Sequence, residues 1–142
     1  MFYLKTVLLL CICTIVSFEA FAADERAKTA ATLNKACLKE KLSSDQNTEE
    51  CIWIASKHCE TDFNVRGSHE CEVIILESWQ IVLNEELTQT DMTKEEQSHL
   101  LENLKQYSNI KCGFYGFAGP IITCRVEEYG DLARLIFADI NN

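Results

Sequence analysis

The cysteine pattern constrains this chain more than any other feature. Beyond residue 22 the chain has six cysteines, which are Cys37, Cys51, Cys59, Cys71, Cys112 and Cys124. An even number of cysteines in a short exported domain is typical of a disulfide framework. Metal binding is the alternative, but the sequence has no C-x-x-C pair and no His-x3-His spacing. We therefore expect three disulfides, no metal site and no cofactor.

The expectation of export rests on the N-terminal segment. Lys5 is the only early positive charge, residues 7–16 are apolar, and an Ala-Phe-Ala cleavage sequence occupies residues 20–22. The apolar run is too short for a membrane span, which needs about 20 residues. These features predict a secretory signal peptide over residues 1–22 and a single mature domain over residues 23–142, located in the periplasm.

Cleavage after residue 22 would also remove Cys11 and Cys13. Lipoprotein processing at one of these cysteines is a rival interpretation, but neither follows a lipobox of small residues. The formal charge of −9 is unchanged by cleavage, because Lys5 and Glu19 leave together.

The charge balance excludes some partners and favours others. The chain has 22 acidic and 13 basic side chains and no run of basic residues, so a nucleic-acid partner is not expected. An acidic surface suits a positively charged protein partner through electrostatic steering. Solubility alone is the other explanation of this charge.

Hydrophobic periodicity predicts an all-α fold, while one proline and five glycines argue against a β fold with many turns. We expect antiparallel helical hairpins, or a bundle of four to five helices, joined by disulfides. The first helix covers about residues 24–42, and a short second helix starts at a capping-box-like pair, Asn47 and Glu50, and continues to Cys59.

Ser68 is expected to cap a third helix, the most regular of all. Thr93 and Glu96 form a capping box for a fourth helix, and a last helix runs from about residue 121 to residue 140. The glycine-rich segment 113–120 is expected to be irregular. The predicted inner face of the third helix consists of Cys71, Ile74, Ile75, Trp79, Val82, Leu83 and Leu87. That of the fourth consists of Leu100, Leu101, Leu104, Tyr107 and Cys112.

Helix geometry restricts the disulfide pairing. Cys51 and Cys59 are eight residues apart, which is roughly 12 Å in a continuous helix and too far for a disulfide. Six cysteines allow fifteen pairings. Antiparallel neighbours favour the sequential one, in which Cys37 pairs with Cys51, Cys59 with Cys71, and Cys112 with Cys124.

The sequence offers no recognisable catalytic motif. It lacks a G-x-S-x-G elbow, a glycine-rich phosphate loop and an H-E-x-x-H pair, and its three histidines are isolated. Four glutamate pairs, at residues 49–50, 85–86, 95–96 and 127–128, could act as acid and base on a glycan. Most of them fall near helix starts or on polar faces, where a carboxylate needs no catalytic role. We therefore expect no catalytic residues and a binding module rather than an enzyme.

The aromatic loop is the candidate binding feature. Phe114, Tyr115 and Phe117 lie among glycines in a segment that Cys112 and Cys124 would close. Cross-linking restricts a loop before it binds, and aromatic rings carry much of the energy of protein interfaces. The rings are therefore candidate partner contacts. In the alternative interpretation they fold back and fill the end of the bundle.

The segment over residues 71–84, CEVIILESWQIVLN, resembles the pattern C…E…WD..LN..Y of the LprI-like lysozyme-inhibitor domain family of exported bacterial proteins. Upstream, Cys51-Ile52 and Cys59 are similar to the CI……C element of that family. Downstream the family shows Q..W..YR(D)…C, a loop and another cysteine. The positions that correspond here are Leu101, Leu104, Tyr107, Ser108, Cys112 and Cys124.

The resemblance covers about residues 51–124, with Trp79, Leu83, Asn84, Tyr107 and the cysteines as direct matches. Asn84 is expected to cap a helix or to bond across helices. Four positions depart from the pattern: Gln80 replaces Asp, Leu87 replaces Tyr, Leu104 replaces Trp and Ser108 replaces Arg. The fold and the disulfide framework therefore carry over better than any binding surface.

The resemblance implies a small helical, disulfide-linked periplasmic domain that inhibits lysozyme or a related peptidoglycan-cleaving enzyme. Lysozymes are commonly basic and have a cleft, which suits an acidic domain that presents an aromatic loop. Two alternatives stay open. One is a structural or assembly component of the envelope without an enzyme target, and the other is an immunity protein against a cell-wall toxin. The sequence leaves the oligomeric state undecided.

Overall fold

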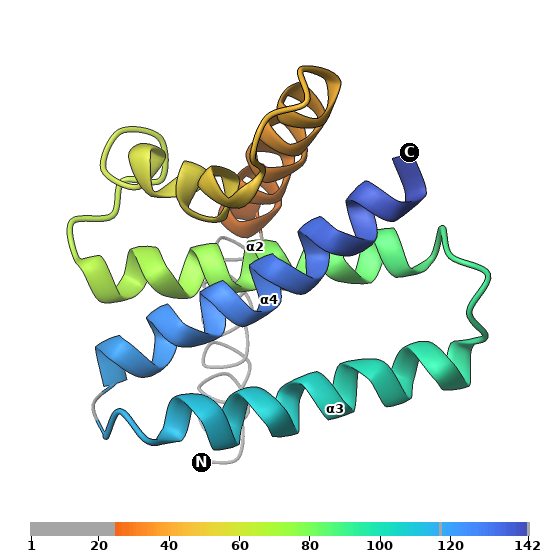
Figure 1. Cartoon of the computed structure of the whole chain (residues 1–142). Helices are drawn as coiled ribbons and strands as arrows, with labels where there is room; N and C mark the ends of the chain where they lie inside the picture. The colour runs from red at the N-terminus through yellow and green to blue at the C-terminus, as the bar shows by residue number, and fades with distance from the viewer. Residues whose placement is uncertain (1–24, 117, 142) are drawn as a thin grey trace, which may run out of the picture.

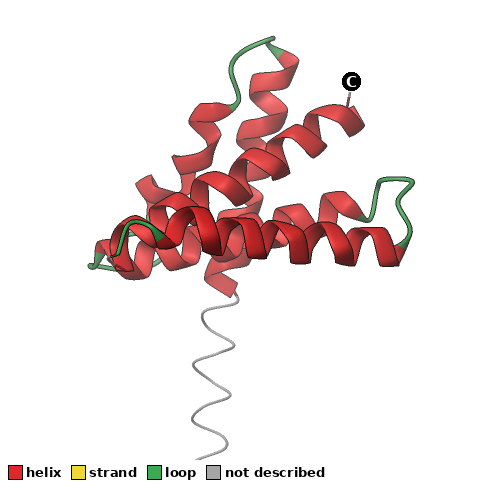
Figure 2. Cartoon of the chain, turned by 60° about the horizontal axis from the view of Figure 1, so that its bottom comes forward, coloured by secondary structure: helices red, strands yellow, loops and turns green. Residues whose placement is uncertain are grey.

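The computed structural model describes residues 25–116 and 118–141, and all regular structure in these residues is helical (Figures 1 and 2). The elements are a first helix over residues 25–43, the 3₁₀-helix η1 (Glu49–His58), α2 (Ser68–Leu87), α3 (Lys94–Gly113) and α4 (Ala118–Asn141). The expected all-α fold is confirmed. None of these described helices is both long and apolar enough to cross a membrane. The predicted signal peptide lies outside the described residues.

Helix α4 is the element around which the others are arranged. It packs along α2 and also contacts α3 and η1 (Figure 1). The chain reverses direction between α2 and α3 and again between α3 and α4. The first helix and η1 form a second hairpin, which lies against α2 on the side away from α3.

The core is centred where α2, η1 and α4 meet. Trp79 of α2 is fully buried, and its indole N–H donates to the carbonyl oxygen of Ile52 in η1 at 2.9 Å. Gly130 of α4 faces both side chains. A Cβ atom built on Gly130 would lie 3.2 Å from two carbon atoms of Ile52 and 3.4 Å from the Trp79 ring. Gly130 therefore lets α4 approach the Trp79–Ile52 pair more closely than any other residue would.

The predicted apolar face of the third helix is confirmed. On α2 every predicted position beyond Cys71 is buried, and on the first helix Ala27, Ala30, Ala31 and Leu38 are buried. Periodicity did not indicate a fully buried polar pair between the first helix and α2. Asn34 and Ser78 are both completely buried, and the Asn34 amide donates to the Ser78 hydroxyl at 2.9 Å.

The sequential disulfide pairing is confirmed. Cys37 pairs with Cys51, Cys59 with Cys71, and Cys112 with Cys124, with Cα–Cα distances of 5.7, 5.7 and 5.6 Å. Each disulfide joins consecutive elements of the chain. Cys51 in η1 and Cys59, which directly follows η1, bond to different neighbours, as the distance argument required. A 3₁₀-helix rises about 2 Å per residue, so it separates them further than an α-helix would.

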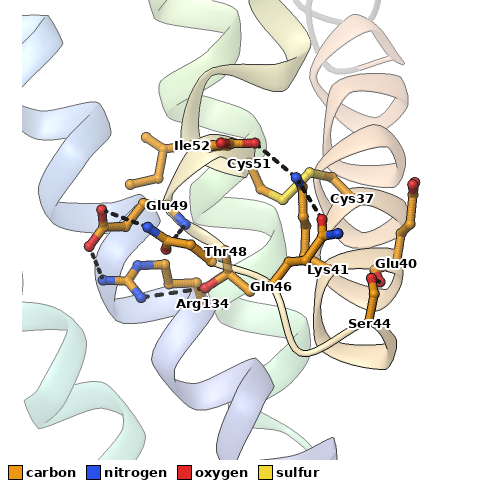
Figure 3. Close-up of a disulfide and its surroundings, with 12 residues drawn as sticks. Cys37, Glu40, Lys41, Ser44, Gln46, Thr48, Glu49, Cys51, Ile52 and Arg134 are labelled. Atoms are coloured by element: carbon orange, nitrogen blue, oxygen red, sulfur yellow. Dashed lines mark hydrogen bonds and ion pairs between the residues drawn. A yellow bond between two sulfur atoms is a disulfide. The ribbon is translucent and has the colours of Figure 1, made fainter.

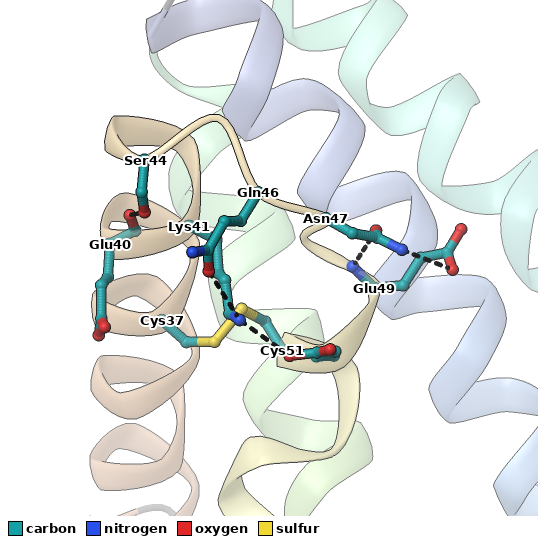
Figure 4. A network of polar contacts seen from close by, with 9 residues as sticks. Cys37, Glu40, Lys41, Ser44, Gln46, Asn47, Glu49 and Cys51 are labelled. Carbon is teal, nitrogen blue, oxygen red and sulfur yellow. Dashed lines mark hydrogen bonds and ion pairs between the residues drawn. A yellow bond between two sulfur atoms is a disulfide. The ribbon is translucent and has the colours of Figure 1, made fainter.

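Polar contacts around the first disulfide connect the first helix, η1 and α4. Lys41 bonds to Glu50 at 2.8 Å beside the Cys37–Cys51 bond (Figures 3 and 4). On the other side of η1, Arg134 of α4 lies 3.4 Å from the Thr48 hydroxyl and 3.7 Å from the Glu49 carboxylate (Figure 3). The start of η1 is thus held from two sides.

The predicted capping residue is wrong for two of the helices. The Asn47–Glu50 capping box does not form. Instead Asn47 accepts a hydrogen bond from the Glu49 backbone N–H at 2.9 Å, a turn that suits a tight 3₁₀ start (Figure 4). Ser68 is the first residue of α2 and makes no cap, because Gly67 occupies the cap position. The Thr93–Glu96 capping box of α3 is confirmed.

The glycine-rich segment is shorter than expected. Gly113 is the last residue of α3, and α4 already begins at Ala118, so Ala118, Gly119 and Pro120 are helical. A proline is tolerated in the first helical turn, because backbone N–H groups there have no acceptor within the helix. Only a short connection, which begins at Phe114, remains between the two helices.

We predict that Gly130→Ala lowers the free energy of unfolding by about 1 kcal/mol. The added methyl group crowds Ile52 and Trp79, which are buried in the core, and overpacking of this kind costs about 1–3 kcal/mol. That cost exceeds the gain of about 1 kcal/mol in helix propensity. Denaturant unfolding of the oxidised protein measures the difference.

Gly119→Ala is the matched control, because a Cβ atom there meets nothing within 4 Å. It should leave stability unchanged or raise it by roughly 0.5 kcal/mol, since alanine is the better helix former. Equal stabilisation by both substitutions would show that the contact at Gly130 is loose.

Candidate functional site

Exposed large apolar side chains gather at one corner of the molecule. Five such residues are exposed among those described, and four lie at the end of α3 or directly after it. Phe114 is 86% exposed and Ile110 is 68% exposed. Contiguous exposed apolar surface of this kind marks interaction sites in many proteins. We call this surface the aromatic corner; its residues are Tyr107, Ile110, Phe114 and Tyr115.

Helix periodicity aligns three of these side chains. Tyr107, Ile110 and Phe114 are spaced i, i+3 and i+7, so they follow one face of α3 and its C-cap. The inward face of the same helix carries its two buried residues, Ser108 and Cys112. The apolar stripe is therefore on the side of α3 that faces away from α4.

The structure excludes the second interpretation of the aromatic loop, in which the rings fill the end of the bundle, for the rings it describes. Phe114 and Tyr115 are 86% and 54% exposed, so they do not fold back to fill the end of the bundle. Gly116 has a φ of 69°, a left-handed conformation that suits glycine and turns the chain toward α4. Phe117, the third predicted contact, lies outside the described residues.

Covalent and polar contacts tie the aromatic corner to α4. The Cys112–Cys124 disulfide joins the two helices one turn from the exposed rings. Asn109 accepts a hydrogen bond from Arg125 at 2.6 Å, and Lys111 pairs with Glu128. The hydrogen bond that Lys111 donates to Glu128 raises the pKa of Lys111, which stays charged at neutral pH beside the Tyr107 ring, 5.7 Å from its centroid. These contacts hold the end of α3 in place.

An open, acidic hollow adjoins the exposed rings. It has a volume of about 460 Å³ and is lined by Tyr115, by Pro120 and Thr123 of α4, and by two carboxylates. One carboxylate belongs to Glu72 of α2 and the other to Glu127 of α4. The corner therefore combines apolar rings with negative charge, which suits a partner surface that carries basic side chains.

Sequence reasoning misplaced one residue of the corner and missed another. Tyr107 was predicted on the inner face of α3 but is 52% exposed, and Ile110 was not singled out. Leu100, Leu101 and Leu104 are only partly buried. The i, i+3, i+7 spacing from Tyr107 to Phe114 was the available signal. This spacing was overlooked because the leucines of α3 had already indicated which face of the helix is buried.

The other residues that the sequence analysis singled out do not form a further site. Glu96 caps α3, while Glu85 and Glu86 both contact Lys35. Asn84 is exposed and makes no hydrogen bond with the described residues, so the expected cap or cross-helix bond is wrong. No group of three or more metal-ligating side chains occurs in the part of the chain that the structure describes.

Comparison of the chain with protein-family models, with curated proteins and with solved structures finds no match. The resemblance to the LprI-like family thus stays a prediction from the residues given above.

We predict that removing the Cys112–Cys124 bond by a double alanine substitution loosens the end of α3. Helix α3 contacts α4 and buries only two residues, so the disulfide supplies much of its attachment. The free energy of unfolding should fall by about 3 kcal/mol. Amide hydrogen exchange over the last two turns of α3 should become at least tenfold faster relative to the centre of α2.

Double alanine substitution at Cys59 and Cys71 is the matched control. Both disulfides have a sequence separation of 12, so their removal changes the unfolded chain to the same extent. The control should lower global stability without selective exchange in α3. Equal protection of α3 in both variants would show that noncovalent packing alone holds the aromatic corner.

Proposed function

We propose that this protein is a periplasmic binding module that inhibits lysozyme or a related peptidoglycan-cleaving enzyme through its aromatic corner. The observation that carries the proposal is the exposure of Phe114 at 86% on a corner fixed by a disulfide. Exposing a large apolar ring in water is unfavourable, and a disulfide-linked fold of this size has a core in which to bury it. A partner that covers the ring accounts for its position.

The shape of the aromatic corner suits insertion into a concave partner. Phe114 and Tyr115 project at the turn between two helices, and the stripe formed by Tyr107 and Ile110 continues from them along α3. Because the disulfide and the Lys111–Glu128 pair hold this end, little order has to be imposed on binding. An enzyme cleft is a concave surface that such a projecting corner can fill.

Charge favours a basic target. The chain carries a formal charge of −9, and Glu72 and Glu127 flank Tyr115 in the acidic hollow. Long-range attraction would speed association with a positively charged enzyme. Lysozymes are commonly basic, which makes this class the first target to test. Export, which the proposal needs, is supported by the predicted signal peptide and by the three disulfides.

The first test is a titration of muramidase activity with the oxidised protein, against lysozymes of animal and bacterial origin. We expect stoichiometric inhibition of at least one basic lysozyme, weakening as the salt concentration rises because screening reduces charge attraction. Absence of inhibition across the panel would overturn the assignment of the target. The envelope-assembly and immunity alternatives would then be tested by isolating the protein with its partners.

We predict that Phe114→Ala weakens inhibition by about tenfold or more, as expected for a central aromatic contact. Its melting temperature should stay unchanged, because the ring makes little contact within the protein. Inhibition constants and thermal unfolding measure the two effects separately.

Leu135→Ala is the matched control, since Leu135 is a large apolar residue of α4 that is 57% exposed but lies outside the aromatic corner. It should change neither inhibition nor stability. Equal loss of inhibition in both variants would assign the effect to general surface hydrophobicity, against the proposed contact.

A further inference from the structure

A second candidate surface lies at the opposite end of α4 from the aromatic corner. There the first helix, the last turns of α2 and the end of α4 enclose an open groove with a volume of about 570 Å³. Its floor is apolar and is formed by Ala31, Ala36, Ile81 and Phe137. Its size falls within the range of about 300–1,000 Å³ that is typical of small-molecule sites.

One wall of this groove is basic. Lys28, Lys35 and Lys39 line it at spacings i, i+7 and i+11 of the first helix, so they share one face. Glu85 is the only carboxylate among the lining residues. Over residues 25–43 the chain has five basic and two acidic side chains, the reverse of the excess in the whole chain. Positive charge is therefore concentrated beside an apolar floor.

The three lysines differ in how far they are already paired. Lys35 contacts Glu86 at 2.9 Å and Glu85 at 3.1 Å, so its charge is compensated within the protein. Lys28 has an exposed ion pair with Glu25, a type of contact that contributes little and exchanges easily. Lys39 is exposed and makes no ion pair with a described residue. It is the cation best placed to receive an external anion.

The groove continues beyond Phe137. An adjoining hollow of about 760 Å³ shares Lys35, Glu85 and Phe137 with it and also includes Ile140. A ligand whose anionic end lies at Lys39 can extend over Ala36 and Phe137, whereas most of the remaining lining of the adjoining hollow is polar. A head group with one negative charge and an unbranched apolar tail matches this order of a cation followed by an apolar floor.

We propose that this groove binds a long-chain carboxylate, with the carboxylate at Lys39 and the alkyl chain along Ala36, Ile81 and Phe137. The site is independent of the proposed inhibition, because the aromatic corner shares no residue with it. Two forces contribute to binding, burial of the alkyl chain and attraction to the lysine wall. The length of the alkyl chain and the charge of the lysine wall can be varied separately.

The experiment is an NMR titration of the oxidised protein with sodium dodecanoate below its micelle-forming concentration. We expect saturable shifts at the backbone amides of Ala31, Ala36, Ile81 and Phe137, and none at the aromatic corner. Octanoate should bind at least tenfold more weakly, because each buried methylene contributes about fourfold in affinity. Equal affinity for both chain lengths, or shifts only at the aromatic corner, would overturn the proposal.

Two substitutions test the two halves of the site. Lys39→Gln should weaken dodecanoate binding about threefold, whereas Lys57→Gln, the same change on η1 away from the groove, should not. Ala36→Leu places a larger side chain on the floor at an exposed helical position that leucine tolerates, and it should weaken binding about tenfold. Unchanged affinity in either groove variant would overturn the corresponding contact.

Two further probes distinguish the ligand class. Dodecyltrimethylammonium has the same tail and the opposite charge, so it should bind more weakly than dodecanoate, and Lys39→Gln should strengthen its binding rather than weaken it. An acidic hexapeptide of alternating leucine and glutamate should bind more weakly than dodecanoate. Tighter binding of either probe would show that the groove serves another kind of ligand and would overturn the proposal.

Discussion

A buried indole determines how the helices of this protein meet. The Trp79 N–H bonds to the carbonyl of Ile52, which ties η1 to α2, and Gly130 lets α4 pack directly against both. The indole N–H, which is fully buried, would otherwise lack a partner in the interior, and an unsatisfied buried polar group costs about 1–3 kcal/mol. The contact thus defines both distance and orientation among three helices. The surfaces at the two ends of α4 depend on that arrangement, since α4 contributes to each.

The disulfides act at the edges of this core. Cys51 and Cys59 attach η1 at two points to different neighbours, which supports a 3₁₀-helix longer than the few residues usual for this geometry. Cys112–Cys124 serves a helix that has little core of its own, because α3 buries only Ser108 and Cys112. A helix with so few buried side chains can present an apolar stripe to solvent, provided that a covalent bond keeps it in place.

Local signals predicted a large part of the fold. The buried face of α2 follows from its periodicity, the capping box at Thr93 needs only residues three apart, and the pairing of cysteines follows from consecutive antiparallel elements. The predictions that proved wrong concern alternatives that are close in energy. Asn47 can bond to the Glu49 or the Glu50 N–H, and Ser68 can cap a helix or begin one. At η1 the Asn47–Glu49 bond forms where Arg134 of α4 also contacts Thr48 and Glu49, and at α2 Gly67 takes the cap position.

The sequence predicted the candidate site only in part, because the exposure of a side chain depends on tertiary packing. The sequence by itself determined the helices, the three disulfides, the acidic charge and the presence of aromatic residues between Cys112 and Cys124, because these depend on composition and short spacings. Only the tertiary structure decided that Phe114 and Tyr115 face solvent, that Tyr107 and Ile110 join them, and that the lysines of the first helix border an apolar groove. Exposure depends on which face α4 and α2 cover, and that choice is made by packing among elements distant in the chain.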